Sequence, residues 1–345
     1  MLAKDTLVYP LARPEPGSFV PVRDGVWWVR LPLPFRLDHI NVWAIEDEEG
    51  WALVDTGIRT EETVAAWERL LAIAPFNRPL TRVIVTHMHP DHIGMAGWLC
   101  RRYGARLWIS SLEYLSCRAL VSDSTREAPA DAVAFYREAG WDVAALDAYR
   151  ARFGNFGKHI YALPDSYRRI EDGQVIRIGG HSWEVVTGHG HSPEHSCLYC
   201  AELKLFISGD QVLPRISSNV SVYPIEPDAD PMADWHASLG RIKARVPDDV
   251  LVLPAHNDCF NGLHARIDDL ESGQIDAEDR LRAALEAPKR AVDVFSALFH
   301  RPVLMSDAAL LGMATGEAKA NLNFLAGRGE IEKRLLDGVW WYRRS

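Results

Sequence analysis

Four short apolar segments of this 345-residue sequence each run directly into side chains that can bind a metal. The segments are RVIVT, WEVVTG, KLFISG and VLVLPA, and the residues that follow them are His87, His89, Asp91 and His92, then His189, His191 and His195, then Asp210, and finally His256. In layered α/β folds, functional side chains collect at strand ends, where loops leave a rigid sheet. The recurrence therefore predicts an α/β fold in which these loops meet at one metal site.

The rest of the sequence predicts strands in its first part and a helical insert further on. Strands rich in Val, Ile and Trp are expected at GVWWVRLPLPF, NVWAIED and GWALVDTGI, and later at QVIRIGG and SCLYCAE. Thr60 is a candidate N-cap for the helix that follows it. Residues 1–24 are Pro-rich and are expected to be irregular. Residues 110–160 are helical in pattern and aromatic, which favours helices that complete the core over a lid above a substrate.

Charge and cysteine content narrow the class of protein. A net charge of −9 disfavours a general surface for polyanions. The five cysteines are odd in number in a long chain, so a disulfide framework is not expected. The N-terminus lacks an apolar run of signal-peptide length, and no segment approaches about 18 consecutive apolar residues. A cytoplasmic protein without membrane association is therefore expected.

The residue types at the four strand ends suit hydrolytic metal chemistry. Neutral imidazole and carboxylate suit zinc, and also iron or manganese. Two ions about 4 Å apart can clamp a hydrolytic transition state from both sides and lower the pKa of bound water to about 7. Two such ions favour a bridging anion, and the carboxylate of Asp210 is a candidate for that bridge.

The motifs resemble those of the metallo-β-lactamase superfamily. THMHPDH resembles its H-x-H-x-D-H motif, GHGHSPEHS its second histidine motif, SGD its bridging aspartate, and LPAH its last histidine. LVDTGI around Asp55 resembles an early strand-and-turn motif of the same families, and the resemblance covers roughly residues 25–262. It implies an αββα sandwich and a dinuclear metal-dependent hydrolase of the glyoxalase II or β-lactamase-like branch, with two zinc ions or with iron or manganese in their place.

The resemblance also assigns roles to the ligands. Carried over to this chain, it implies a first metal held by His87, His89 and His191, a second held by Asp91, His92 and His256, and a bridge at Asp210. The family's ligand is usually the first histidine of an H-x-P-x-H unit, which favours His191 over His189. Asp91 and Asp210 are the candidate catalytic carboxylates, and Asp91 is expected to steady or accept the proton of the attacking water.

Four further residues are candidates for supporting roles. Asp55 is expected to orient the ligand loop, and His195 to support the ligands from behind them. Tyr223, thirteen residues past Asp210, is a candidate oxyanion donor. His39 lies in an N-terminal strand that could line the cleft, although a structural role is favoured there.

The predicted organisation is an N-terminal extension over 1–24, a catalytic domain over 25–287 that contains the insert 110–160, and a small winged-helix-like domain over 288–345. This tail holds nine Lys and Arg against six Asp and Glu. One interpretation is contact with nucleic acid through Lys319, Arg328, Lys333 and Arg334. The favoured one is packing that shapes the cleft or a homodimer, because the excess of positive charge is mild.

Two functions follow from these expectations. The favoured one is hydrolysis of a small acyl substrate, a thioester, lactone or ester, by attack of metal-bound hydroxide. The alternative is a metal-dependent endoribonuclease whose C-terminal domain holds RNA. Zinc β-lactamases are typically secreted and commonly carry a cysteine where this chain has Asp210, so antibiotic hydrolysis is not expected as the main task.

Overall fold

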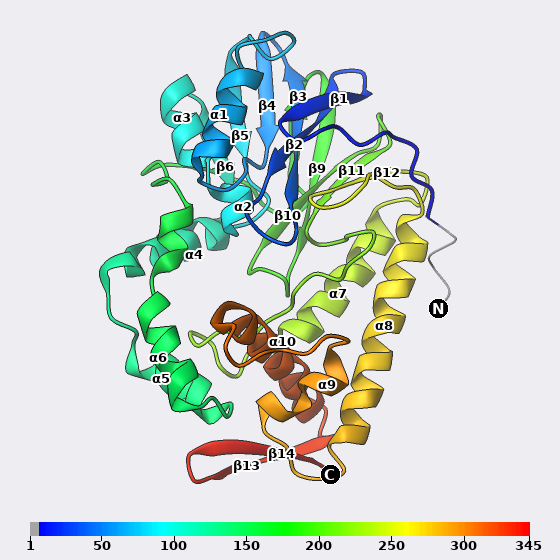
Figure 1. The fold of residues 1–345 in the computed structure, drawn as a ribbon. Coiled ribbons are helices and arrows are strands. Elements are labelled where there is room, and N and C mark those ends of the chain that lie inside the picture. The colour runs from blue at the N-terminus through cyan, green and yellow to red at the C-terminus, as the bar shows by residue number, and fades with distance from the viewer. Residues whose placement is uncertain (1–6) are drawn as a thin grey trace.

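Two β-sheets packed face to face form the upper half of the molecule in a computed structural model that describes residues 7–345 (Figure 1). The first sheet has seven strands in chain order: β1 Ser18–Arg23, β2 Val26–Pro32, β3 His39–Asp47, β4 Gly50–Val54, β5 Leu80–Ile84, β6 Arg106–Ile109 and β7 Arg168–Arg169. The second has five in the order β12 Leu251–Pro254, β11 Leu205–Gly209, β10 His195–Cys200, β9 His181–Gly188 and β8 Val175–Ile178.

The alternation of side chains along the strands builds the layers. In β2, Trp28 is buried between the two sheets while its neighbour Val29 is buried on the outer face of the first sheet. In β9, Val185 and Val186 divide in the same way between the inter-sheet core and the outer face of the second sheet. Both faces of each sheet are therefore apolar, and both outer faces need a cover.

Helices supply that cover. α1 Glu61–Leu70 and α3 Ala96–Tyr103 lie over the first sheet, and α7 Pro231–Arg245 and α8 Leu263–Ala284 lie over the second (Figure 1). The Thr60 hydroxyl accepts a hydrogen bond from the Thr63 amide and caps α1. The αββα sandwich expected from the motifs is confirmed.

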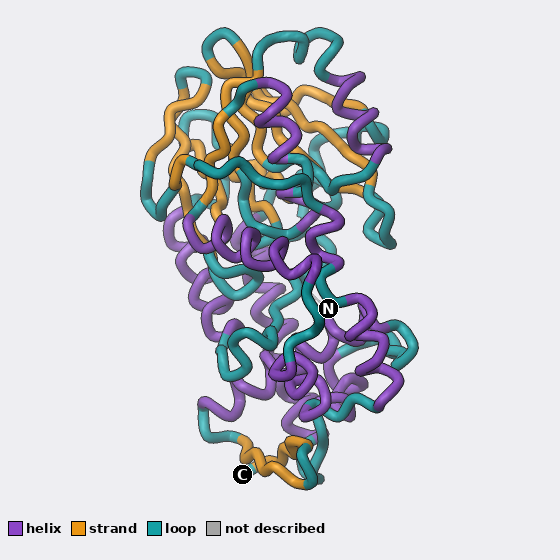
Figure 2. Tube along the Cα trace, turned by 90° about the vertical axis from the view of Figure 1, so that its left-hand side faces the viewer, coloured by secondary structure: helices purple, strands orange, loops and turns teal. Residues whose placement is uncertain are grey.

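The insert and the C-terminal segment form a helical lower half (Figures 1 and 2). The insert contains α4 Ser111–Ser122, α5 Ala130–Glu138 and α6 Val143–Arg152, with 3-10 turns at Asp123–Thr125 and Asn155–His159. After α8, a 3-10 turn at Ala291–Val294 leads to α9 Phe295–Leu298, α10 Ala308–Gly327 and the hairpin β13 Ile331–Leu336 with β14 Val339–Arg344. The hairpin turns at Asp337-Gly338, as the sequence predicts.

One apolar core joins these parts. Phe135 and Trp141 of the insert, Leu311 and Tyr342 of the C-terminal segment, and Phe206 of the second sheet belong to the same cluster of buried side chains. The insert is thus core-forming, as favoured from its sequence, and it packs on the C-terminal segment.

One expectation and one alternative interpretation need correction. The irregular extension ends earlier than residue 24, because Ser18–Arg23 pair with β2 as an edge strand. Lys319 is not available to nucleic acid, because it is only 6% exposed and its Nζ lies 4.6 Å from the centroid of the Phe135 ring.

Within residues 7–345, the helices are all too short or too polar to cross a membrane.

Candidate metal centre

The seven predicted ligands meet at one end of the sandwich. His87 and His89 follow β5, and Asp91 and His92 lie in the short helix α2 Pro90–Ile93 that continues the same loop. His191 lies between β9 and β10, Asp210 follows β11, and His256 follows β12. One loop from the first sheet and three from the second therefore build the cluster.

The seven side chains form two groups. In the first group, which is His87, His89, His191 and Asp210, the ligand atoms lie within 4.8 Å of one another. Nε2 of His87 lies 2.9 Å from Nδ1 of His89 and 3.2 Å from Nε2 of His191. The second group is Asp91, His92 and His256, with Nε2 of His256 3.3 Å from Oδ2 of Asp91.

Asp210 faces both groups. Its Oδ2 lies 3.4 Å from Nε2 of His191 in the first group. Its Oδ1 lies 3.5 Å from Nε2 of His92 and 3.5 Å from Nε2 of His256 in the second. The two carboxylate oxygens are thus divided between the two sets of imidazoles.

Unpaired atoms inside this cluster fit a bound cation. Nε2 of His92 and Oδ1 of Asp210 are buried and have no hydrogen-bond partner within the described residues. Buried polar atoms are normally paired, so two such atoms facing each other fit a site that binds a cation. The donor set of imidazoles and carboxylates is the one that zinc and related divalent metals prefer.

The second ring nitrogen of several histidines is fixed by the protein. Asp55 Oδ2 accepts from Nδ1 of His92 at 2.8 Å, and the same carboxylate accepts from the amide and the hydroxyl of Thr86. Asp55 has a φ of +65°, a left-handed conformation that Asp tolerates better than most residues. These contacts confine Nε2 of His92 to the centre, as expected for a carboxylate that orients a ligand.

Backbone carbonyls orient two more rings. The carbonyl of His39 accepts from Nδ1 of His256 at 2.9 Å, and the carbonyl of Asn219 accepts from Nδ1 of His191 at 2.8 Å. The buried ring of His39 contacts Asp38 and the amide of Asn257. His39 therefore acts on the cluster through its backbone.

The remaining predicted residues lie around the cluster. Nε2 of His195 accepts from the Asp210 amide at 3.1 Å, and its ring stacks on His87 at 4.8 Å between centroids. His189 turns away, with Nδ1 bonded to the carbonyl of Pro193 at 2.7 Å, and is in neither group. Tyr223 is 44% exposed on the loop that follows Asp210.

The pKa values of the clustered histidines and carboxylates shift in different directions. Burial and the nearby His191 lower the pKa of His89 to about 3. Burial also opposes charge on His92, but Asp55, Asp210 and Asp91 together raise its pKa well above the usual value. Burial disfavours ionisation of Asp210, and His256 and His92 nevertheless hold its pKa well below the usual range. The carboxylates thus create a field that stabilises positive charge at the centre.

Glu113 is a site residue that the sequence did not reveal. This fully buried residue of α4 accepts from the Met88 amide at 2.8 Å, the Ser192 hydroxyl at 2.6 Å and the Glu194 amide at 2.7 Å. Burial raises the pKa of Glu113, while these donors act in the opposite direction. The carboxylate ties the loop of His87 to the loop of His191. Its position in a helical segment without a motif gave no signal.

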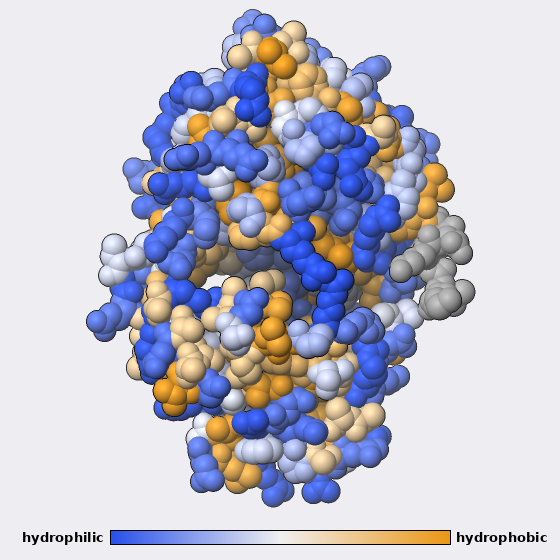
Figure 3. Space-filling view, in the orientation of Figure 1, coloured by the Kyte–Doolittle hydropathy of each residue, from blue (hydrophilic) through white to orange (hydrophobic). Residues whose placement is uncertain are grey.

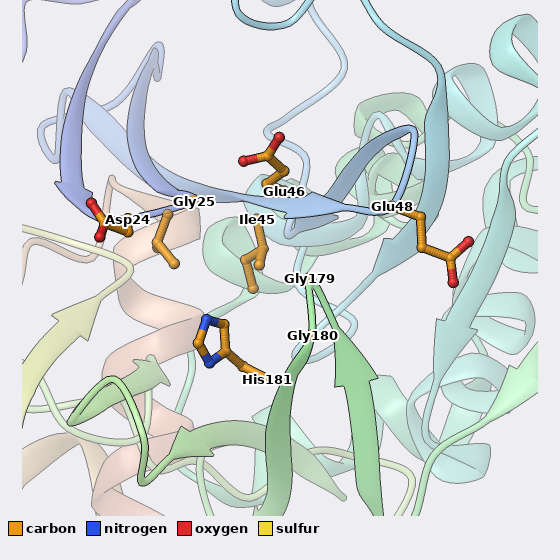
Figure 4. A pocket seen from close by; sticks show the side chains of 9 residues that line it. Asp24, Gly25, Ile45, Glu46, Glu48, Gly179, Gly180 and His181 are labelled. Carbon is orange, nitrogen blue, oxygen red and sulfur yellow. The ribbon is translucent and has the colours of Figure 1, made fainter.

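A third group of potential ligands lies elsewhere. His181, Cys200 and Glu202 gather near the other end of β9, and Figure 4 shows the ring of His181 at a pocket between the strand turns. His181 Nδ1 is already paired with Glu202 at 3.2 Å, and burial raises the pKa of the Cys200 thiol. This group is separate from the predicted centre.

Comparison with known proteins agrees with this geometry. The Metallo-beta-lactamase superfamily model matches residues 36–256, and a model described as Metallo-beta-lactamase-like, C-terminal domain matches residues 278–345. The probable metallo-hydrolase YqjP of Bacillus subtilis is 24% identical over 79% of this chain and 84% of its own length. The hydroxyacylglutathione hydrolase GloC of Haemophilus influenzae is 22% identical over 64% of this chain and 86% of its own length. An atrochrysone carboxyl ACP thioesterase of Cryptosporiopsis is 23% identical over 75% of this chain and 61% of its own length.

Solved structures share the fold over nearly the whole chain. A beta-lactamase domain protein from Burkholderia ambifaria is 39% identical, with a TM-score of 0.89 over 99% of both chains. A metallo-beta-lactamase family protein from Thermus thermophilus is 22% identical, with a TM-score of 0.78 over 94% of this chain and 100% of its own. With a family model matched over 36–256 and the His and Asp cluster assembled at its strand ends, this chain belongs to the metallo-β-lactamase superfamily.

Proposed function

We propose that this protein is a dinuclear metal-dependent hydrolase that acts on a small acyl substrate, with thioesters favoured over lactones and other esters. The observation that carries the dinuclear assignment is the division of the Asp210 oxygens, 3.4 Å from His191 on one side and 3.5 Å from His92 and His256 on the other. His87, His89 and His191 would hold one ion, Asp91, His92 and His256 the other, and Asp210 both.

A pair of zinc ions, or of iron or manganese, would polarise the acyl carbonyl and lower the pKa of water to about 7. The protein's own groups do the rest. Asp91 has a side chain that is 20% exposed, against 3% for His256 and 0% for His92, so it is the carboxylate that water reaches most easily in the second group. It would hold the proton of the attacking water, while Asp55 and His39 keep the rings of their ligands in place.

The acyl class is supported by relatives and by leaving-group chemistry. The relatives of this chain include a hydroxyacylglutathione hydrolase and atrochrysone carboxyl ACP thioesterases. A thiol has a pKa near 8.5, so a thiolate leaves without a strong acid. An amine would need a proton donor. Thioesters are therefore favoured, because their hydrolysis needs no residue that donates a proton to the leaving group.

Nucleic acid is the less favoured substrate, because the four tail cations that were candidates for contacting it are buried or paired. Lys319 is buried, and the others have acidic partners within 4 Å: Arg328 with Glu330, Lys333 with Asp228, and Arg334 with Glu332. Paired surface charges release few counterions on binding a polyanion. The segment 288–345 is instead proposed to shape the cleft.

The test combines metal analysis with a substrate panel. Protein purified under metal-replete conditions is analysed for metal content and assayed on acyl thioesters, lactones and RNA, with Asp210→Ala as the inactive control. Two ions per chain and turnover of thioesters that is lost in the control are the expected results. Metal-dependent RNA cleavage without turnover of any thioester or lactone would overturn the acyl assignment.

A further inference from the structure

A hollow separates the metal centre from the helical lower half. Figure 3 shows it below the sandwich, and in the same view of Figure 1 α4, α6 and α10 border this region. A substrate that reaches the predicted ligands from this side passes between the sandwich and these helices. Helices α6 and α10 therefore lie on the side of this passage that is opposite the metal centre (Figure 1).

Arg152, the last residue of α6, is a half-buried cation without an ion-pair partner at contact distance in the described part of the chain. Its buried Nε has no hydrogen-bond partner among the described residues, and Asp307 acts on its charge only through space. Other shielded arginines are neutralised: Arg82 pairs with Asp47 at 2.7 Å and Arg282 with Glu330 at 2.6 Å. Burial lowers the pKa of Arg152, while Tyr136, Tyr149 and Asp307 act in the opposite direction.

The guanidinium of Arg152 lies among residues of α5, α6 and α10. Its guanidinium carbon lies 5.9 Å from the centroid of the Tyr149 ring. At Gly312 of α10, an added Cβ would lie 2.8 Å from Nη2 of Arg152 and 4.0 Å from the hydroxyl of Tyr136. The missing side chain at Gly312 thus leaves room for the guanidinium, and α5, α6 and α10 bring a phenol beside it. A phenol hydroxyl is a hydrogen-bond donor, so Tyr136 is placed to donate to a ligand held at Arg152.

Hydrogen bonds connect helix α10 beside Arg152 to the loop that positions His191. One turn after Gly312, or about 6 Å along α10, the carbonyl of Gly316 accepts from the Val222 amide at 3.0 Å. Val222 lies on the loop whose Asn219 carbonyl holds His191. One turn of α10 and a few loop residues therefore connect Gly312, which lies beside Arg152, to the carbonyl that holds His191. A group bound at Arg152 belongs to a part of the substrate remote from the scissile carbonyl.

We propose that Arg152, with the Tyr136 hydroxyl, binds a carboxylate or phosphate carried by the leaving-group portion of the substrate. This inference rests on the proposed acyl hydrolase function and narrows it to anionic substrates. A guanidinium offers a planar set of donors that matches both anions and gains strength where water is partly excluded. An anion there would also supply a partner at contact distance, because Asp307 acts on Arg152 only through space.

The test uses three acetyl thioesters: of pantetheine, which is neutral, of pantetheine 4′-phosphate, and of glutathione, which carries carboxylates. Arg152→Gln should raise KM for at least one anionic thioester about 10- to 100-fold, the worth of a charge-assisted hydrogen bond, and leave kcat and the neutral substrate unchanged. The thioester whose KM rises shows whether the site binds a phosphate or a carboxylate. Arg150→Gln, on the same helix and paired with Asp147 at 2.7 Å, is the matched control and should behave as wild type.

A second readout is independent of turnover. Binding of the free thiols glutathione and pantetheine 4′-phosphate to wild type and to Arg152→Gln is measured by calorimetry, and the variant should bind one of them about 10- to 100-fold more weakly. If neither affinity nor KM differs between the two proteins, the anion site is wrong. If wild type binds an anionic thiol but hydrolyses none of the thioesters, the proposed function fails while the site stands.

Discussion

The side-chain amide of Asn219 donates to Oε2 of Glu317 at 2.7 Å, while the backbone carbonyl of the same residue holds Nδ1 of His191 at 2.8 Å. Helix α10 thus reaches a predicted metal ligand through two hydrogen bonds. The C-terminal segment therefore helps to position a predicted ligand. The same segment, which is matched by its own family model, also shares an apolar core with the second sheet.

Glu317 should make stability depend on pH. Burial raises its pKa to about 7, above the usual carboxyl value near 4.3, so folding takes up a proton between these values. Stability should therefore fall as pH rises from about 4.5 through 7. Glu317→Gln keeps an acceptor for Asn219 and removes the titration, so its Tm relative to wild type should increase from pH 5 to pH 8. Parallel Tm curves for the two proteins would exclude this assignment.

Glu113 should hold the two ligand loops together. Glu113→Ala leaves the donors of Met88, Ser192 and Glu194 without their acceptor, which should cost about 3 kcal/mol or more of unfolding free energy. Metal affinity should fall as well, because His87 and His191 lie on the released loops. Denaturant unfolding and metal titration measure both effects, and Glu113→Gln, which retains one oxygen acceptor, should lie between the alanine variant and wild type. Wild-type stability in the alanine variant would remove Glu113 from this role.

The features that could be predicted from the sequence are those that depend on short local patterns. The strands around the site, the α1 cap at Thr60 and the turn at Asp337-Gly338 are local features. The ligand cluster was predictable because each strand end carries its own signal and the strands of a sandwich bring their ends to a common edge.

The supporting contacts were not predictable, because they join distant segments through unremarkable residues. Glu113 lies 79 residues from Ser192, and Asn219 lies 98 residues from Glu317. Neither Glu113 nor Glu317 differs in the sequence from an exposed glutamate on a helix. Only the packing of α4 and α10 against the loops makes Glu113 a buried acceptor and Glu317 a half-buried one.

His191 and His189 should differ in their effect on metal binding. His191 belongs to the first group of ligand atoms, whereas His189 is bonded to the carbonyl of Pro193. His191→Ala should lower metal content and activity, and His189→Ala should leave metal content near the wild-type level. Metal analysis of both variants after the same purification is the measurement. Loss in the His189 variant together with retention in the His191 variant would reverse the assignment.

Asp210 should determine whether two metal ions can be held together. The contacts of its backbone, from its amide to His195 and from Ser218 to its carbonyl, do not involve the carboxylate. Asp210→Ala therefore removes the bridge and leaves the loop anchored, and Asp210→Asn removes the charge with nearly the same shape. Without the anion, two ions near each other would repel with less compensation. We expect metal content to fall from two ions toward one per chain and kcat to fall by about 100-fold or more, with the asparagine variant closer to wild type in Tm. Two ions per chain and undiminished turnover in the alanine variant would show that the division of its two oxygens between the groups has no part in metal binding.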